Sequence, residues 1–249
     1  MASLTRRQML GRASAILGLA PVGTFATQLA PSNDSNKKKF KIIVAGGHPG
    51  DPEYGCGGTI ARFTAAGNDV VLLYLNEGEP NGSPASVKGV RVTEAKRACE
   101  LLKARPLYAV QVDGAAVIDA SHSAKFKEIL EREQPNVVFT HWPIDNHADH
   151  RAISMLVYES WIRLGKRFAM YYYEVSNGED TVQFAPTHYV NISEVAEQKR
   201  SACLAHASQA PGKFYPLQQL VTRFRGVESG HTEAEAFVRH LQSPPFDLP

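Results

Sequence analysis

The stretch VAGGHPGDPEYGCGGT, which spans Val44 to Thr59, begins as an apolar run and continues into glycines that are expected to open a helix. Between these two parts lie His48, Pro49, Gly50 and Asp51, so a histidine and a carboxylate stand three residues apart where a strand is expected to end. Functional sites of open α/β sheets lie at the carboxyl ends of the strands. The turn is therefore the first candidate for a site, and the rest of the chain decides what it could bind.

Apolar runs typical of buried strands alternate with helical patterns over the remainder of the chain. Strands are expected at 40–47, 69–76, 107–112, 136–141, 168–175 and 188–193. Helices are expected at 57–67, 90–104, 123–133, 149–164, 193–207 and 233–241. Repeated βα units of this kind predict an α/β fold with a Rossmann-like, mostly parallel β-sheet and helices on both faces.

Length and composition limit the classes of function. A chain of 249 residues can bury a sizeable core as one domain. Its 27 basic and 25 acidic residues nearly cancel, so no surface for nucleic acid is indicated. The three cysteines are odd in number and far apart, which argues against a disulfide framework, and there is no CxxC pair for a structural zinc. The sequence carries no signal of the oligomeric state.

The N-terminus is typical of a twin-arginine export signal. Arg6 and Arg7 precede a modest apolar segment at 15–22, which is too short to span a bilayer, so no stable membrane anchor is expected. The alternative is an amphipathic basic helix at a ragged terminus. We expect a leader at 1–30, a flexible polar lead-in at 31–39 and one domain at 40–249. A leader of this type implies a bacterial protein that is exported to the periplasm or the exterior.

A second polar cluster follows the strand expected at 136–141. The stretch THWPIDNHADHR places five ligand-type side chains within ten residues: His141, Asp145, His147, Asp149 and His150. Neighbouring strands of an α/β sheet would bring this cluster beside His48 and Asp51. Two histidines and one carboxylate that converge form a three-ligand zinc site with an open position for water, the arrangement of hydrolytic zinc. Such a metal lowers the pKa of its water to about 7 and polarises a carbonyl.

Two alternatives compete with a metal site. A lone histidine at a helix start is more often a cap or a surface residue than a ligand. The glycines of GCGGT could cradle a phosphate, but GxGxxG spacing and the P-loop lysine are both missing. For the same lack of a glycine fingerprint, a nucleotide-binding Rossmann domain is disfavoured. The clustering of three histidines and two aspartates favours the metal.

These motifs resemble those of a known family. GGHPGDPEYGCGGTIARF is similar to the first motif of the LmbE-like (PIG-L) zinc-dependent de-N-acetylases, in which AHPDD is followed one residue later by Glu and then by GCGGT. HADH resembles their second motif, HPDH. Further similarity lies in NEGEPNG, RVTEAKRA, VDG, KRSACLAHASQ and EAEAF. The resemblance therefore covers most of the chain from about Phe40 onward.

Carried over by position, the resemblance implies roles for the polar residues of both motifs. It implies that Zn²⁺ is held by His48, Asp51 and His150. It also implies that His147 stabilises or protonates the tetrahedral intermediate, and that Asp149 orients a histidine and so fixes its tautomer and basicity.

The resemblance also implies a substrate-binding pair, Arg91 and Asp113, at positions that hold sugar hydroxyls. The alternative for Arg91 is an ion pair with Glu94 at i,i+3 on one helix face. Lys199 and His206 lie on the matching C-terminal segment, where helix-face and capping roles are at least as consistent with the sequence.

Gly50 is the departure from the family motif, which has two adjacent aspartates. The second, Asp51 here, binds zinc, and the first is the general base that takes a proton from the attacking water. A positioned base is worth roughly 10²–10⁴ in rate. The glycine therefore predicts a slow enzyme, a different substrate, or another base, with His147 first and Glu53 or Asp145 behind it.

The sequence thus predicts a metal-dependent amide hydrolase with a substituted base. Its substrate would be a small molecule or glycan that contains an N-acetylated or similarly N-acylated amino sugar. The alternative is a zinc-containing glycan-binding protein with little or no turnover.

Overall fold

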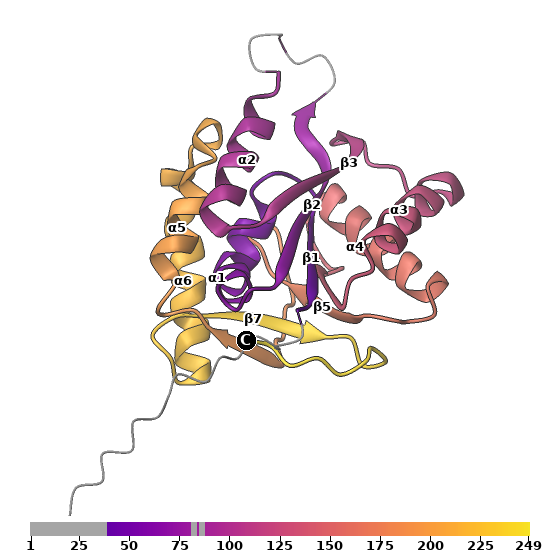
Figure 1. Ribbon diagram of the computed structural model, residues 1–249. Helices are drawn as coiled ribbons and strands as arrows, with labels where there is room; N and C mark the ends of the chain where they lie inside the picture. The colour runs from indigo at the N-terminus through magenta and orange to yellow at the C-terminus, as the bar shows by residue number, and fades with distance from the viewer. Residues whose placement is uncertain (1–38, 81–83, 85–87) are drawn as a thin grey trace, which may run out of the picture. The chain divides into compact units, whose positions relative to one another are not determined.

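Strand β1 (Lys41–Gly46) lies at the centre of the fold (Figure 1). The structure is a computed structural model that describes residues 39–80, 84 and 88–249. β1 pairs in parallel with β2 (Asp69–Pro80) on one side and with β4 (Val137–His141) on the other. Every residue of β1 after the first is buried, because helices cover both faces of the sheet.

Within the described residues the sheet has seven strands in the order β3-β2-β1-β4-β5-β7-β6. The remaining strands are β3 (Arg105–Asp113), β5 (Ala169–Tyr173), β6 (His188–Asn191) and β7 (Ala234–Arg239). β1 to β5 run parallel, whereas β7 is antiparallel to both β5 and β6. The predicted mostly parallel, Rossmann-like sheet is confirmed.

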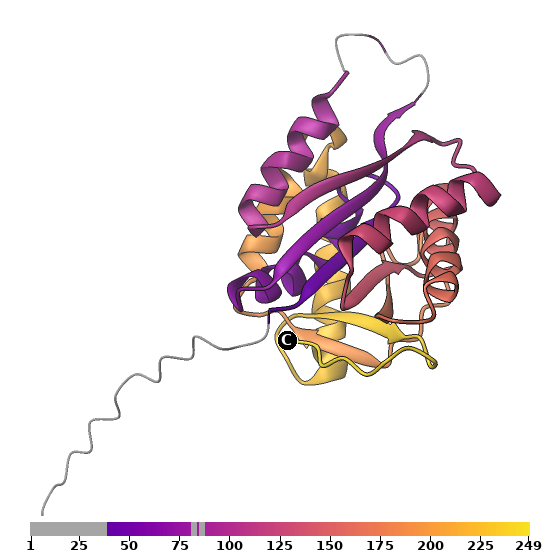
Figure 2. The same cartoon turned by 45° about the vertical axis from the view of Figure 1, so that its right-hand side comes forward.

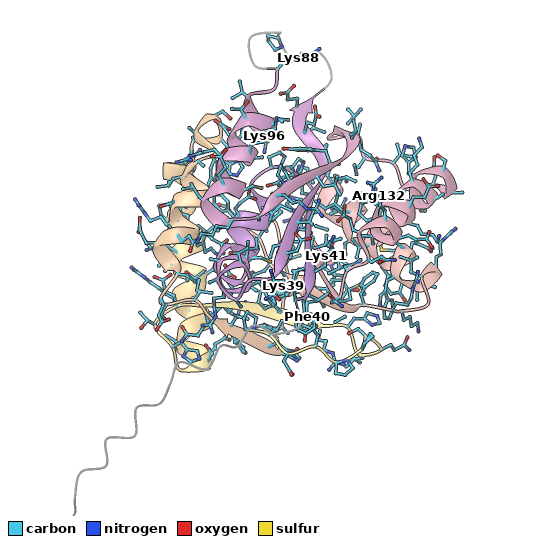
Figure 3. All side chains as sticks on the ribbon, in the orientation of Figure 1. Lys39, Phe40, Lys41, Lys88, Lys96 and Arg132 are labelled. Atoms are coloured by element: carbon cyan, nitrogen blue, oxygen red, sulfur yellow. The ribbon has the colours of Figure 1, made fainter. Side chains whose placement is uncertain are left out.

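Two helical layers enclose the sheet. The α-helices are α1 (Asp51–Ala65), α2 (Val90–Leu102), α3 (Ala120–Glu133), α4 (Ala148–Arg163), α5 (Ala196–Leu204) and α6 (Pro211–Ser229). Figures 1 and 2 show α1, α2 and α5 on one face and α3 and α4 on the other. Alternate residues of β1 supply the two cores, with Ile42 and Val44 in the first and Ile43 and Ala45 in the second. Side chains fill both layers (Figure 3).

The switch point of the sheet lies between β1 and β4. The chain leaves β1 to form β2 and β3 on one side, and it then crosses to form β4 and β5 on the other. Because β1 and β4 are parallel neighbours, the loops that follow them open at the same edge. Open α/β sheets bind their ligands at such a crevice. Both polar motifs follow these two strands.

The sequence-based prediction is wrong for one segment near the C-terminus, and it misses one helix. Residues 233–241 were expected to be helical, but Ala234–Arg239 forms strand β7, where Phe237 packs into the core between β5 and β6. The residues Ala and Glu favour helices, but pairing with two strands overrides this weak preference. Helix α6 was not predicted, since Pro216 and Gly226 interrupt its pattern.

Helix α1 begins earlier than expected, at Asp51 instead of residue 57. The GCGGT stretch therefore lies inside a helix, and the alternative of a phosphate-cradling loop is wrong for it. The early start places Asp51 in the first turn, where the positive end of the helix dipole favours a carboxylate.

The described residues belong to one compact unit. No helix among them is long and apolar enough to cross a membrane. The export leader expected at 1–30 and nearly all of the lead-in expected at 31–39 lie outside the described residues, so both stay predictions.

Candidate metal centre

The side chain of Asp51 is the meeting point of the two motifs. Its Oδ2 accepts the backbone N–H of His48 at 2.8 Å, which fixes the turn after β1. The same oxygen lies 3.3 Å from Nδ1 of His48 and 3.2 Å from Nε2 of His150. The three side chains that the resemblance implied as zinc ligands are therefore brought together, although 99 residues separate Asp51 from His150 in the sequence.

Each of these histidines uses its other ring nitrogen to contact a carboxylate. Nε2 of His48 lies 3.2 Å from Oδ2 of Asp149 and 3.1 Å from Oδ1 of Asp113. Nδ1 of His150 lies 3.1 Å from Oδ1 of Asp145. Histidines that bind metals almost always donate their second N–H in this way, which fixes the tautomer and raises the basicity of the ligand nitrogen. The donor set therefore fits a zinc ion, with His48 Nδ1, His150 Nε2 and Asp51 as ligands.

The electrostatics of the cluster point to the same conclusion. Burial lowers the pKa of His48, but contacts with Asp113, Asp149 and Asp51 outweigh burial and raise it to about 11. Burial also opposes the positive charge of His150, yet Asp51 and Asp145 raise its pKa to about 9. The carboxylates thus stabilise positive charge at this point. Two protonated rings supply that charge here, and a divalent cation would supply it as well.

The structure groups ligand atoms in sets that differ from the implied one, and His48, Asp51 and His150 do not form one of these sets among the described residues. Three groups have ligand atoms within 4.8 Å of one another: His48, His147 and His150; Asp51, His141 and His150; and His48, Asp113 and Asp149. His141 is fully buried, and its ring stacks on His150 with centroids 3.9 Å apart. Its Nε2 accepts the backbone N–H of Gly47 at 3.2 Å. We interpret His141 as a packing support for His150, a role that sequence reasoning missed.

Asp149 is fully buried, and its carboxylate faces His48. It also accepts hydrogen bonds from Nδ2 of Asn76 at 3.0 Å and from the backbone N–H of Gly114 at 2.9 Å. The resemblance implied that Asp149 orients a histidine, without deciding which one. In the structure the ring that its carboxylate contacts is His48.

His147 is the N-cap of α4, and its Nδ1 accepts the backbone N–H of Asp149 at 3.2 Å. Burial and the charges of His48 and His150 lower its pKa, so the ring is neutral at pH 7. Because Nδ1 uses its lone pair as an acceptor, the proton of the neutral ring lies on Nε2. His147 is therefore positioned to donate a hydrogen bond to a ligand and not to accept a proton from it.

A cavity of about 320 Å³ opens over this cluster, within the range of small-molecule sites. The residues that line it are His48, Pro49, Gly50, Asp51, Tyr54, Arg91, Asp113, His147, His150, Val175, Ser176, Asp180, His206, Gln209 and Phe214. Both implied substrate-binding residues are therefore in the same cavity as the implied zinc ligands.

The side chain of Arg91 forms part of the wall of this cavity. One Nη donates to the carbonyl oxygen of Gly78 at 3.0 Å and lies 3.8 Å from the carboxylate of Asp113. The alternative ion pair with Glu94 is wrong, because the carboxylate of Glu94 accepts hydrogen bonds from Ser208 instead. Arg91 and Asp113 thus face the cavity as a charged pair.

Gly50 adopts a backbone conformation with φ of 114°, which residues with a side chain rarely adopt. A Cβ on this residue would lie 3.8 Å from Cδ2 of His206, so the surrounding space is sufficient and the backbone conformation is the obstacle. An aspartate at this position would therefore be strained in the turn as it stands.

Two of the alternative bases are already engaged by other side chains. Glu53 is fully buried, does not line the cavity, and lies 3.0 Å from Nε2 of His206. Asp145 faces the ring of His150 and accepts a hydrogen bond from Oγ1 of Thr181 at 3.0 Å. Neither carboxylate is free to act on a ligand.

Lys199 has a structural role. Its Nζ lies 2.6 Å from Oε1 of Glu235, and both side chains are almost fully buried. The same carboxylate accepts the backbone N–H groups of Gly58 and Thr59. Lys199 therefore ties α5 to α1 and β7 beneath the site.

The chain is similar in sequence to known proteins. The profile of the PIG-L family, described as GlcNAc-PI de-N-acetylase, matches residues 43–161. A curated relative, the diacetylchitobiose deacetylase of Thermococcus kodakarensis, is 29% identical over 226 residues, which cover 82% of this chain and 83% of the relative.

Solved structures show the same fold. A conserved protein of Thermus thermophilus superposes with a TM-score of 0.71 at 29% identity, covering 83% of this chain and 97% of the other. The 4-carboxy-2-hydroxymuconate hydratase of Pseudomonas putida superposes with a TM-score of 0.73 at 21% identity, covering 84% of this chain and 100% of the other. The second likeness concerns the fold alone.

Proposed function

We propose that this chain is a zinc-dependent hydrolase that removes an N-acetyl group from an amino-sugar substrate, since the profile of the PIG-L (LmbE-like) family matches residues 43–161. The observation that carries the proposal is the meeting of His48, Asp51 and His150 at the floor of a cavity, with carboxylates behind both rings. The names of the family and of the Thermococcus relative, both deacetylases of N-acetylated sugars, support the substrate class.

Different residues of the cavity have different roles in the proposed amide hydrolysis. When bound, zinc supplies Lewis acidity that polarises the amide carbonyl and lowers the pKa of water to about 7. His147 presents Nε2–H toward the cavity, so it can donate to the carbonyl oxygen as negative charge develops there. Arg91 and Asp113, which line the same cavity, offer a donor and an acceptor for sugar hydroxyls.

Gly50 favours a second candidate, a zinc-containing glycan-binding protein with little or no turnover. The position that carries the base in the family motif has no side chain here. The fold alone does not fix the reaction, since a similar fold belongs to a protein named as a hydratase.

An assay of purified, zinc-loaded protein against N-acetylated sugars, with release of acetate as the readout, tests the proposal. We expect multiple turnovers with at least one mono- or disaccharide, and no turnover after chelation. Saturable sugar binding without acetate release would favour the binding protein and overturn the hydrolase.

A further inference from the structure

The cavity contains a carboxylate that neither the family motifs nor the mechanism above uses. Asp180 is half-buried and lines the cavity together with Asp51, His147 and His150. Its carboxylate has no hydrogen bond or ion pair with any residue that the structure describes. An acidic side chain that faces a ligand cavity without a protein partner is available to interact with the ligand.

The backbone holds Asp180 rigidly against the second motif. The carbonyl oxygen of Asp180 accepts the N–H of Asn146 at 2.8 Å, one residue before His147. On the other side of the loop, the N–H of Asp180 donates to the carbonyl oxygen of Ser176 at 3.0 Å, where Ser176 has a positive φ of 46°. A residue in this sparsely populated conformation is one of the places where proteins build functional sites. Asp180 is therefore anchored at both of its backbone polar groups.

The neighbouring Thr181 strengthens the same attachment. It forms an isolated β-bridge with Asp145, and its Oγ1 both donates to the carboxylate of Asp145 and accepts the N–H of Val175 at 3.0 Å. Since Asp145 contacts His150, the loop that carries Asp180 is tied through Asp145 to the implied zinc ligand. The position of Asp180 relative to the cluster is thus set by buried hydrogen bonds.

The other candidates for a base are excluded by their contacts. His147 has its neutral proton on Nε2, and Glu53 and Asp145 are engaged elsewhere. We propose, resting on the proposed hydrolase function, that Asp180 is a catalytic residue: the general base that replaces the carboxylate missing at Gly50. The replacement comes from a loop about 130 residues further along the chain.

In this proposal the carboxylate of Asp180 takes up one proton and later returns it, so the reaction is balanced. As the water oxygen bonds to the amide carbon, one water proton passes to the carboxylate of Asp180, and the carbonyl electron pair moves to its oxygen beside His147. As the C–N bond breaks, the nitrogen takes the proton from Asp180, which becomes a carboxylate again. The acetic acid formed then loses its proton to the released amine. The products are acetate and an ammonium sugar, without any other reactant.

The surroundings of Asp180 suit this role. Burial raises the pKa of its carboxyl, the positive charge of His150 opposes this rise, and the negative charges of Asp145 and Asp51 add to it. A carboxylate with a raised pKa is a stronger base and works best near the pH at which it titrates. Because the base must be ionised, turnover should fall as the pH drops through this raised pKa.

The test compares Asp180→Asn with Glu179→Gln, which removes an exposed carboxylate from the same loop outside the cavity. With an N-acetyl sugar, we expect kcat of Asp180→Asn to fall roughly 10²–10⁴-fold, with KM, zinc content and Tm unchanged and the acid limb of the pH profile lost. Glu179→Gln should match the unmodified protein. A kcat within about threefold of the unmodified protein, or a change in KM alone, would overturn the assignment.

A second measurement tests the environment of Asp180 without turnover. Carbon NMR titration of the aspartate carboxyls, with Asp180 assigned by its loss in Asp180→Asn, should show Asp180 titrating above its ordinary 3.8. If the unmodified protein releases no acetate from any sugar, the proposed hydrolase function fails. In that case a carboxyl of Asp180 that titrates at or below 3.8 would reject the base assignment as well.

Discussion

The guanidinium of Arg91 lies in the space that a side chain on residue 78 would fill: a Cβ on Gly78 would be 2.5 Å from Cζ and Nε of Arg91. Gly78 also has a positive φ of 75°. This glycine therefore allows the cavity wall to carry an arginine close to the backbone, and the position of the guanidinium depends on it.

The first prediction follows from this contact. Gly78→Ala should displace the guanidinium of Arg91 and lower kcat/KM about ten- to hundredfold, mainly through KM, since a hydrogen bond to a charged group is worth about 1.5–3 kcal/mol. Gly89→Ala is the matched control, because Gly89 has the same φ of 75° but no atom within 4 Å of its Cβ position. Equal kinetic losses in the two variants would show that backbone strain, and not the arginine, is responsible.

The second prediction concerns the metal. His48→Ala, Asp51→Ala and His150→Ala should each lose bound zinc in elemental analysis of the purified protein. His147→Ala should keep most of the zinc but lose turnover, because we place His147 beside the substrate and not on the metal. Full zinc in His150→Ala, or loss of zinc in His147→Ala, would move the site to another of the overlapping groups.

The third prediction concerns stability of the metal-free protein. The folded-state pKa values of His48, about 11, and His150, about 9, both exceed the ordinary 6.5. A raised pKa means that the folded state binds the proton more tightly, so this stabilisation is complete below pH 6.5 and is lost as the pH rises through 9 toward 11.

Thermal melting after chelation should therefore give a Tm that falls between pH 6.5 and 9. The zinc-loaded protein should lose less, because the cation replaces both protons. A metal-free Tm that stays level or rises over this interval would contradict the charge balance that we infer for the cluster.

The fourth prediction concerns the missing aspartate. With Asp180 as the base, Gly50→Asp should leave turnover level or lower it, since a second carboxylate is redundant and strains a turn with φ of 114°. In the Asp180→Asn background the same change should instead raise turnover by about one to three powers of ten.

Gly50→Ala controls for the strain in both backgrounds, because it introduces a Cβ without a carboxylate. A clear gain in turnover from Gly50→Asp in the otherwise unmodified protein would show that the unmodified site contains no working base.

The parallel half of the fold could be predicted from the sequence because each strand is a continuous apolar run with glycine or polar residues at its ends. Strand β7 could not, since its Ala and Glu residues have helical preferences and its partners β5 and β6 lie about 40–70 residues away. The burial of Glu235 against Lys199 is likewise a long-range contact without a local pattern. Tertiary pairing decided these elements, and a single sequence does not display it.

Some residues of the candidate site could likewise be predicted from the sequence, and others could not. His48, Asp51 and His150 stand in compact motifs, so their chemistry is visible before the structure. The contact of Asp149 with His48 depends on the adjacency of β1 and β4 and on side-chain direction, which spacing does not encode. Asp180 lies in the turn SNGED, where an acidic residue is common. Only its backbone hydrogen bond to Asn146 in the second motif indicates that it belongs to the site.

Strand β7 lies between β5 and β6 although both precede it in the chain. During synthesis, β6 has no partner in the sheet until Ala234–Arg239 has left the ribosome, and β5 keeps an open edge until then. The buried ammonium group of Lys199 also lacks its carboxylate partner until that strand, which contains Glu235, has formed. The sheet therefore cannot be completed before Ala234–Arg239 has been synthesised, and until then β5 presents an unpaired edge to any neighbouring strand.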